Sequence, residues 1–173
     1  MNSRRRFICV GVAATLVTWR SAAAQQMATL KISGEVASEL TLTIDDLKKL
    51  SQRHIDDLRS IEQDGRREEQ ARKYVGVLLK DVLDRAKLVE TQPRGLRRSV
   101  VIATARDGYK AIFSWAELYL SPVGDGALVA YERDGAPLLD DEGPLALVSL
   151  KDTRPGPRHV KWLQSIEVRL VAD

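Results

Sequence analysis

The side chains best suited to chemistry lie in a basic loop near the C-terminus, residues 151–161. Three of them, Arg154, Arg158 and Lys161, can hold an anionic or carbonyl-rich group, and arginine does so with a planar fork of donors. Asp152 can accept hydrogen bonds from a ligand, and the loop's prolines and glycine restrict its backbone and allow close approach. The alternative is a solvated turn whose charges pair with neighbouring carboxylates. The sequence leaves both interpretations open.

A second candidate site lies earlier in the chain. Trp115 has an aromatic face that can stack on a flat ligand, and Glu117 can form two parallel hydrogen bonds with a ligand edge. The structural alternative is that Ser114 and Glu117 form the capping box of a short helix, with Trp115 packed in the core. Tyr109 is a further candidate for lining the same pocket.

Histidine and cysteine do not form a recognisable metal site in this sequence. His54 and His159 are the only histidines and lie more than a hundred positions apart, which does not indicate shared coordination. His159 borders the proposed pocket and can donate a hydrogen bond to a ligand oxygen. Nucleophile motifs such as Gly-x-Ser-x-Gly and glycine-rich phosphate-binding loops are missing. The sequence therefore predicts no catalytic residue and no metal ligand.

Residues 1–24 have the organisation of a signal peptide. Arginines at positions 4–6 precede an apolar run over 7–17, and alanines provide a cleavage site near Ala24. The run is shorter than the ~20 apolar residues that a membrane-spanning helix needs. The adjacent arginines favour twin-arginine export, with the general secretory route as the alternative. We therefore expect a periplasmic protein whose domain comprises residues 25–173.

Removal of the signal peptide changes the charge of the protein. Residues 1–24 include four arginines and no acidic residue, so 23 of the 27 basic residues remain against 24 acidic ones, a net charge of −1. Such a balance does not indicate nucleic acid or an anionic membrane as a partner. The only cysteine, Cys9, would also be removed, which excludes disulfides, thiolate metal sites and a cysteine nucleophile from the rest of the chain.

The remaining sequence predicts a single α+β domain. Thr43 can cap a short helix, and the apolar spacing over residues 79–86 predicts a second helix. Residues 53–73 are compatible with a helix or with a strand and a long polar loop. Runs of β-branched and apolar residues predict strands at 30–36, 99–105, 109–113, 127–132, 145–150, 160–163 and 166–171. These elements predict a mixed or barrel-like β-sheet with short peripheral helices.

The order of several short segments resembles the molybdopterin-binding domain of the sulfite oxidase family, across nearly the whole chain beyond residue 24. The segments lie at residues 42–47, 74–83, 105–109, 134–138, 143–148 and 158–168. No single segment is specific, and the resemblance rests on their order and spacing. It implies the fold of that domain, with a pterin pocket beside the basic loop.

One departure from the family bears directly on function. Its enzymes hold molybdenum through a cysteine near the end of the strand that precedes the segment at 74–83, whereas residues 61–65 here are Ile-Glu-Gln-Asp-Gly. Aspartate and glutamine do not replace a soft thiolate ligand. The sequence is more similar to a branch of short exported proteins without this cysteine. Members of that branch bind reduced pterins and regulate membrane-bound enzymes that make or degrade cyclic di-GMP.

This resemblance implies a pterin-binding regulator that is not an enzyme, carries no molybdenum and acts on the extracytoplasmic domain of a membrane signalling protein. In that interpretation Trp115 stacks on the pterin, and a carboxylate of Glu117 or Asp152 binds its amino group and ring N–H. Two alternatives remain. One is a molybdopterin-dependent oxidoreductase, which the missing cysteine disfavours, and the other is a ligand-free adaptor that uses the fold as a protein-binding surface.

Overall fold

The computed structural model describes residues 28–63, 66–138, 141–153 and 156–171. The expected signal peptide and Arg154 lie outside these residues, so the structure does not bear on either prediction. Within the described part of the chain, no helix is long and apolar enough to cross a membrane.

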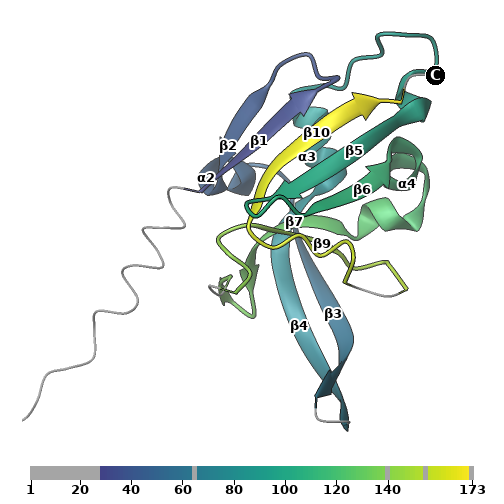
Figure 1. The fold of residues 1–173 in the computed structure, drawn as a ribbon. Coiled ribbons are helices and arrows are strands. Elements are labelled where there is room, and N and C mark those ends of the chain that lie inside the picture. Colours follow the sequence, from purple (N-terminus) through teal and green to yellow (C-terminus); the bar gives the residue numbers. More distant parts are fainter. Residues whose placement is uncertain (1–27, 64–65, 139–140, 154–155, 172–173) are drawn as a thin grey trace, which may run out of the picture.

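A five-stranded mixed sheet forms one layer of the molecule (Figure 1). Its strands are β1 (Thr29–Gly34), β2 (Leu40–Thr43), β5 (Ser99–Ala105), β6 (Lys110–Ser114) and β10 (Leu163–Leu170). They lie in the order β2-β1-β10-β5-β6, in which β1 and β10 are parallel and the other neighbours antiparallel. The first and last strands of the domain are therefore neighbours within one sheet.

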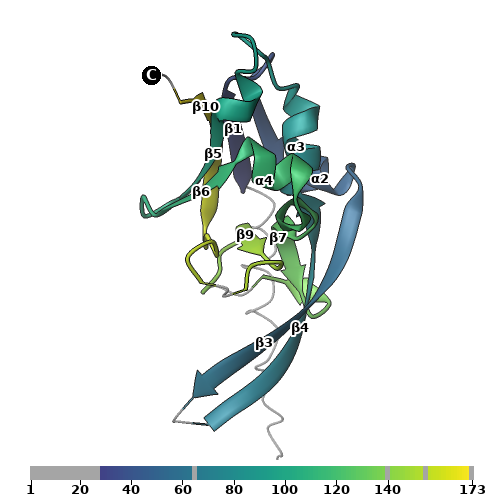
Figure 2. The same ribbon diagram turned by 90° about the vertical axis from the view of Figure 1, so that its right-hand side faces the viewer.

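A second sheet contains the remaining strands. These are β3 (Gln52–Gln63), β4 (Arg66–Leu78), β7 (Ala127–Arg133), β8 (Ala136–Pro137) and β9 (Ala146–Ser149). The order is β3-β4-β7-β8, and β9 also pairs with β7. Because β4 pairs with β7 only from Tyr74 to Leu78, the rest of β3 and β4 forms a two-stranded arm that projects from the body (Figures 1 and 2).

In the described part of the chain, three short α-helices connect the strands: α2 (Ile44–Lys48), α3 (Leu79–Ala86) and α4 (Trp115–Leu120). The structure confirms Thr43 as the cap of α2, since its Oγ accepts from the backbone N–H of Asp46 at 3.2 Å. In α3, four residues on one face are buried. Two 3₁₀ turns, Leu96–Arg98 and Pro122–Asp125, flank β5 and β7.

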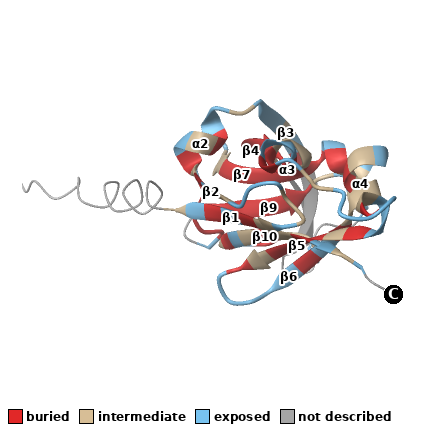
Figure 3. Cartoon of the chain, turned by 90° about the horizontal axis from the view of Figure 1, so that it is seen from above, coloured by how far each residue is buried: buried red, intermediate tan, exposed pale blue. Residues whose placement is uncertain are grey.

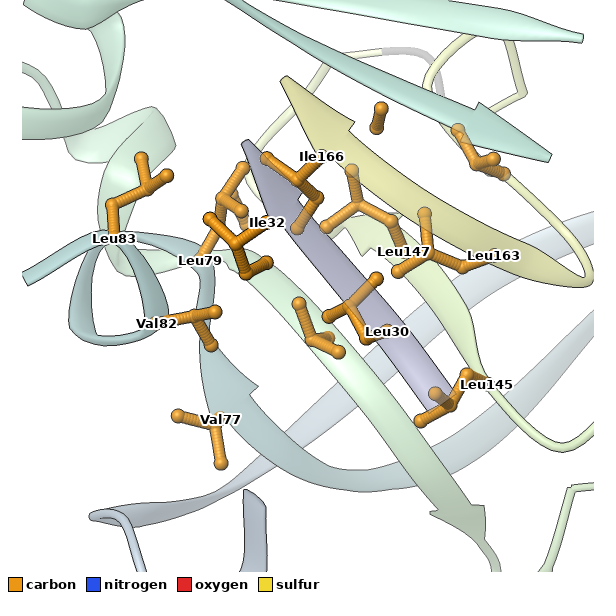
Figure 4. Packing of buried hydrophobic residues seen from close by; sticks show 14 of the residues in the cluster. Leu30, Ile32, Val77, Leu79, Val82, Leu83, Leu145, Leu147, Leu163 and Ile166 are labelled. Atoms are coloured by element: carbon orange, nitrogen blue, oxygen red, sulfur yellow. The ribbon is translucent and has the colours of Figure 1, made fainter. Parts of the chain in front are cut away.

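The main core lies between the mixed sheet, the helices and the inner strands of the second sheet (Figures 3 and 4). It draws on β1, β10, β4, β9 and α3, through residues that include Leu30, Ile32, Ile166, Val77, Leu147, Leu79, Val82 and Leu83. Burying one such side chain contributes ~1.5–3 kcal/mol. The core also contains Leu118 of α4 and Val160 of the C-terminal loop, so it anchors both segments to the same body.

The predicted α+β class is confirmed, and the structure decides between the alternatives at residues 53–73. Neither a helix nor a long polar loop forms there, because β3 and β4 pair rung by rung from Gln52↔Val77 to Gln63↔Arg66. The two residues between the strands are Asp-Gly, a dipeptide that favours tight hairpins. The C-terminal strand also differs from expectation: it is continuous from Leu163, and Val160 forms only an isolated bridge with Leu147.

Candidate functional site

Three charged side chains, Glu117 of α4 and Asp152 and Arg158 of the basic loop, meet in the candidate site. Arg158 donates from Nε to Asp152 Oδ2 at 2.7 Å and from Nη2 to Asp152 Oδ1, so its guanidinium binds both oxygens of one carboxylate. Its Nη1 donates to Glu117 Oε1 at 3.0 Å. The guanidinium carbon also lies 4.6 Å from the centre of the Phe113 ring. Bidentate pairing of this kind orients both partners, so the cluster has a defined geometry.

Glu117 is positioned by the beginning of α4. The backbone N–H of Ser114 donates to Glu117 Oε2 at 2.8 Å, and the backbone N–H of Glu117 donates to Ser114 Oγ at 3.1 Å. The predicted capping box is therefore confirmed, and the other carboxylate oxygen faces Arg158. Burial alone would raise the pKa of Glu117, but the hydrogen bonds from Ser114 and Arg158 lower it. The carboxylate is thus kept ionised.

The charge of this cluster favours a particular kind of ligand. Two carboxylates and one guanidinium give a net charge of −1, and the hydrogen bond to Asp152 is the main cause of a raised pKa for Arg158. The Glu117 side chain is 40% exposed, whereas those of Asp152 and Arg158 are 12% and 21% exposed. A ligand that presents N–H donors therefore finds its most accessible acceptor at Glu117.

The two aromatic residues predicted for the site, Tyr109 and Trp115, contact residues outside the charged cluster. The Tyr109 hydroxyl donates to the backbone carbonyl of Pro157, which ties the β5–β6 turn to the C-terminal loop. The indole of Trp115 stacks on Tyr119, with ring centroids 5.1 Å apart and an interplanar angle of 17°. One face of Trp115 is therefore covered within its own helix, and the residue is half-buried instead of packed in the core.

His159 belongs to a second cluster that the sequence did not predict. Its Nε2 lies 3.6 Å from Glu142 Oε2, and the Glu142 side chain is only 1% exposed. Glu142 also accepts hydrogen bonds from Arg133 Nη1 and from the Tyr74 hydroxyl, the latter at 3.2 Å. Arg72 Nη1 lies 4.0 Å away. The cluster connects β4, β7 and the two loops that flank β9.

The surroundings of Glu142 determine its ionisation. Burial on its own would raise the pKa of this carboxyl group. The nearby His159 imidazole, the charge of Arg133 and the hydrogen bond from the Tyr74 hydroxyl outweigh burial and lower the pKa to about 2. Glu142 is therefore a buried, permanently ionised group at neutral pH. A single glutamate before Gly-Pro gives no sequence signal for this role, because its partners lie on other strands.

The other predicted site residues are more peripheral. Lys161 is exposed, and its Nζ lies 3.4 Å from Asp141 Oδ2. Arg154 lies outside the described residues. Ser149, at the end of β9 just before the basic loop, is an additional candidate: it is 2% exposed, and its Oγ has no hydrogen-bond partner among the described atoms. A buried hydroxyl of this kind can be satisfied by a bound ligand.

Residues 18–171 match the model of the family described as oxidoreductase molybdopterin binding domain. This chain belongs to that family. Its structure is similar to the crystal structure of the sulfane dehydrogenase SoxCD from Paracoccus pantotrophus, with a TM-score of 0.65 and 21% sequence identity. The similarity covers 84% of this chain and 39% of that chain, so this chain spans about two fifths of its length. No curated protein matches the sequence.

These findings confirm the family resemblance and the fold, and they correct one expectation. The expectation that the chain is not an enzyme is wrong, because the family to which it belongs is one of oxidoreductase domains. The missing cysteine does not by itself exclude an enzyme. A protein holds and orients a cofactor through many contacts besides a metal ligand. The chain is a molybdopterin-binding domain of oxidoreductase type, with a pterin-type ligand.

Proposed function

We propose that this chain binds the pterin of a molybdopterin-type cofactor at the Glu117–Asp152–Arg158 cluster and serves an oxidoreductase reaction. The observation that carries the proposal is the meeting of these side chains, from α4 and the basic loop, in a member of a molybdopterin-binding family. Glu117 is also held by Ser114, and Asp152 binds Arg158 through both of its oxygens, so the donors and acceptors are oriented before a ligand arrives. Preorganisation of this kind lowers the cost of binding.

The chemistry of a pterin matches the cluster. Its pyrimidine edge carries an amino group and a ring N–H side by side, and a carboxylate can accept both. Glu117, as the most exposed carboxylate of the three, is suited to that contact. Arg158 then faces a carbonyl or anionic group of the ligand with donors already fixed in a plane. Ser149 Oγ can supply one further hydrogen bond at the base of the loop.

The donor set of the chain does not fit a molybdenum ion that is ligated by a protein thiolate. The only cysteine is Cys9, near the N-terminus. Among the residues that the structure describes, no group of three or more His, Cys, Asp or Glu side chains could hold a metal ion. The proposed role of this chain is therefore to bind and orient the organic part of the cofactor, and no step is assigned to a metal.

Titration with a reduced pterin tests the proposal. We expect a tetrahydropterin to quench the intrinsic fluorescence of the purified protein with a dissociation constant in the micromolar range. Replacing Glu117 by Gln should weaken binding about tenfold or more, because a hydrogen bond to a charged group contributes ~1.5–3 kcal/mol. Asp45→Asn removes an exposed carboxylate from α2 and should leave binding unchanged. Equal affinity for the wild type and the Glu117 variant would contradict the assigned site.

Circular dichroism separates a binding effect from a folding effect, because Glu117 also caps α4. Glutamine retains an acceptor oxygen and can still complete a capping box. A variant that keeps the far-ultraviolet spectrum but loses affinity supports the proposal. Complete absence of pterin binding by the folded wild type would refute it.

We also propose that the protein acts in the periplasm and modulates a membrane-bound cyclic di-GMP enzyme through its extracytoplasmic domain. The support is the signal-like sequence of residues 1–24 and the lack of a cysteine at residues 61–65, which this chain shares with the regulators it resembles. Deleting the gene should change cellular cyclic di-GMP, and a Glu117→Gln allele should reproduce the change. An unaltered cyclic di-GMP level in the deletion strain would contradict this role.

A further inference from the structure

The projecting arm of β3 and β4 has an open edge. β3 is the terminal strand of its sheet, and among the described residues it pairs only with β4. The part of β4 that precedes Tyr74 does not pair with β7, so a two-stranded ribbon extends away from the core (Figure 2). Isolated two-stranded ribbons are marginally stable in water, and an open edge can accept another strand.

The length of β3 limits how two copies can pair through this edge. When two copies of a strand pair antiparallel about a two-fold axis perpendicular to the sheet, directly opposite side chains lie on the same face of the sheet. Because side chains alternate between the two faces, this is possible only if one residue lies on the axis, directly opposite the same residue of the other copy. The strand runs from Gln52 to Gln63. Nearly full overlap of two such strands is therefore possible only with Asp57 or Leu58 on the axis.

The residue types distinguish these two registers. With Asp57 on the axis, two aspartates occupy opposite positions, which is destabilising. With Leu58 on the axis, leucine is opposite leucine and Ile55 is opposite Ile61. The same register places His54 opposite Glu62, and Asp57 opposite an arginine at position 59. In these pairs apolar residues meet apolar ones and acidic residues meet basic ones, while Asp56 lies opposite Ser60 and Arg53 opposite Gln63, where neither pair brings like charges together.

We propose that two copies of this chain dimerise by antiparallel pairing of their β3 strands, with Leu58 on the two-fold axis. The four strands of the two arms then form one continuous sheet in the order β4-β3-β3-β4. This interface is independent of the candidate pterin site, which is built from α4 and the basic loop.

Cysteine cross-linking tests the register. Opposite residues in an antiparallel pair have Cα atoms about 4.5–5.5 Å apart, within the range that a disulfide spans. In a Cys9→Ser background, Leu58→Cys should form a disulfide-linked dimer under mild oxidation. Asp56→Cys is the matched control, because the two copies of residue 56 lie four positions apart along the ladder, about 13 Å. Cross-linking of Asp56→Cys as efficient as that of Leu58→Cys, or none with Leu58→Cys, overturns the register.

Sedimentation velocity on the uncross-linked protein tests the dimer itself. We expect a concentration-dependent dimer for the wild type, and at least a tenfold weaker one for His54→Glu, which places like charges opposite each other. Adding Glu62→His to that variant swaps the pair and should restore dimerisation. A wild type that stays monomeric at all concentrations refutes the proposal, and so does a double variant that remains as weak as the single one.

Discussion

Replacing Glu142 by Gln should make the protein less stable at neutral pH and less sensitive to acid. The wild-type carboxylate is 1% exposed and is bound by Arg133 and Tyr74, with His159 3.6 Å away. Removing one member of a buried charged network typically costs about 3–5 kcal/mol, because the remaining charges lose their partner. We therefore expect a decrease of this size in the free energy of unfolding of Glu142→Gln at pH 6.

The pH dependence of the free energy of unfolding gives a second quantity that can be measured. A carboxyl group whose pKa is 4.5 when unfolded and about 2 when folded stabilises the protein above pH 4.5, and this contribution disappears as the pH falls through 2. The difference corresponds to about 3 kcal/mol in total, of which about 2 kcal/mol is lost between pH 6 and pH 3. Glu142→Gln lacks this contribution, so its stability should fall by about 2 kcal/mol less over the same interval.

Urea denaturation followed by circular dichroism at several pH values between 3 and 6 measures both quantities. Glu39→Gln is the control, because that side chain is 61% exposed and pairs with Lys31 on the surface. Its stability should differ from that of the wild type by less than about 0.5 kcal/mol. If Glu142→Gln and the wild type lose stability in parallel on acidification, the assignment of a strongly lowered pKa to Glu142 is wrong.

Two further predictions concern local geometry. Gly143→Ala should destabilise the protein by about 2 kcal/mol or more, since its φ is 77° and a Cβ would lie 2.5 Å from the Trp162 ring. Gly108→Ala, with a φ of 90° and no atom within 4 Å, should cost only about 1 kcal/mol, and thermal unfolding compares the two. Ser114→Ala should lower stability by about 1 kcal/mol through loss of the cap. It should also weaken pterin binding in the fluorescence titration, because Glu117 loses the hydrogen bonds with the Ser114 hydroxyl that orient its carboxylate.

Local signals in the sequence predicted much of the fold. The helix cap at Thr43 and the capping box at Ser114 depend on residues within three positions of each other, so residue type and spacing suffice to identify them. The buried face of α3 follows from its apolar spacing in the same way. The arm was ambiguous because its charged residues show neither a clear helical nor a clear strand period, and the pairing of β3 with β4 decides the conformation.

The candidate site was only partly predictable. The basic loop and Glu117 could be named from residue type, but their contact through Arg158 depends on how the core brings α4 to the loop. His159 was expected beside the ligand, whereas the structure places it against Glu142. That second cluster joins residues from four separate segments, and no spacing along the chain encodes such a meeting. A buried charged residue can be recognised only when its partners are known, and here the partners are known only from the folded structure.

The most direct test of the account is mass spectrometry of small molecules released from the protein after purification from its native host. The account predicts one pterin per chain in the wild type and a clear loss of it in Glu117→Gln. A folded wild-type protein that releases no pterin, and takes up none when reduced pterin is added, would contradict it.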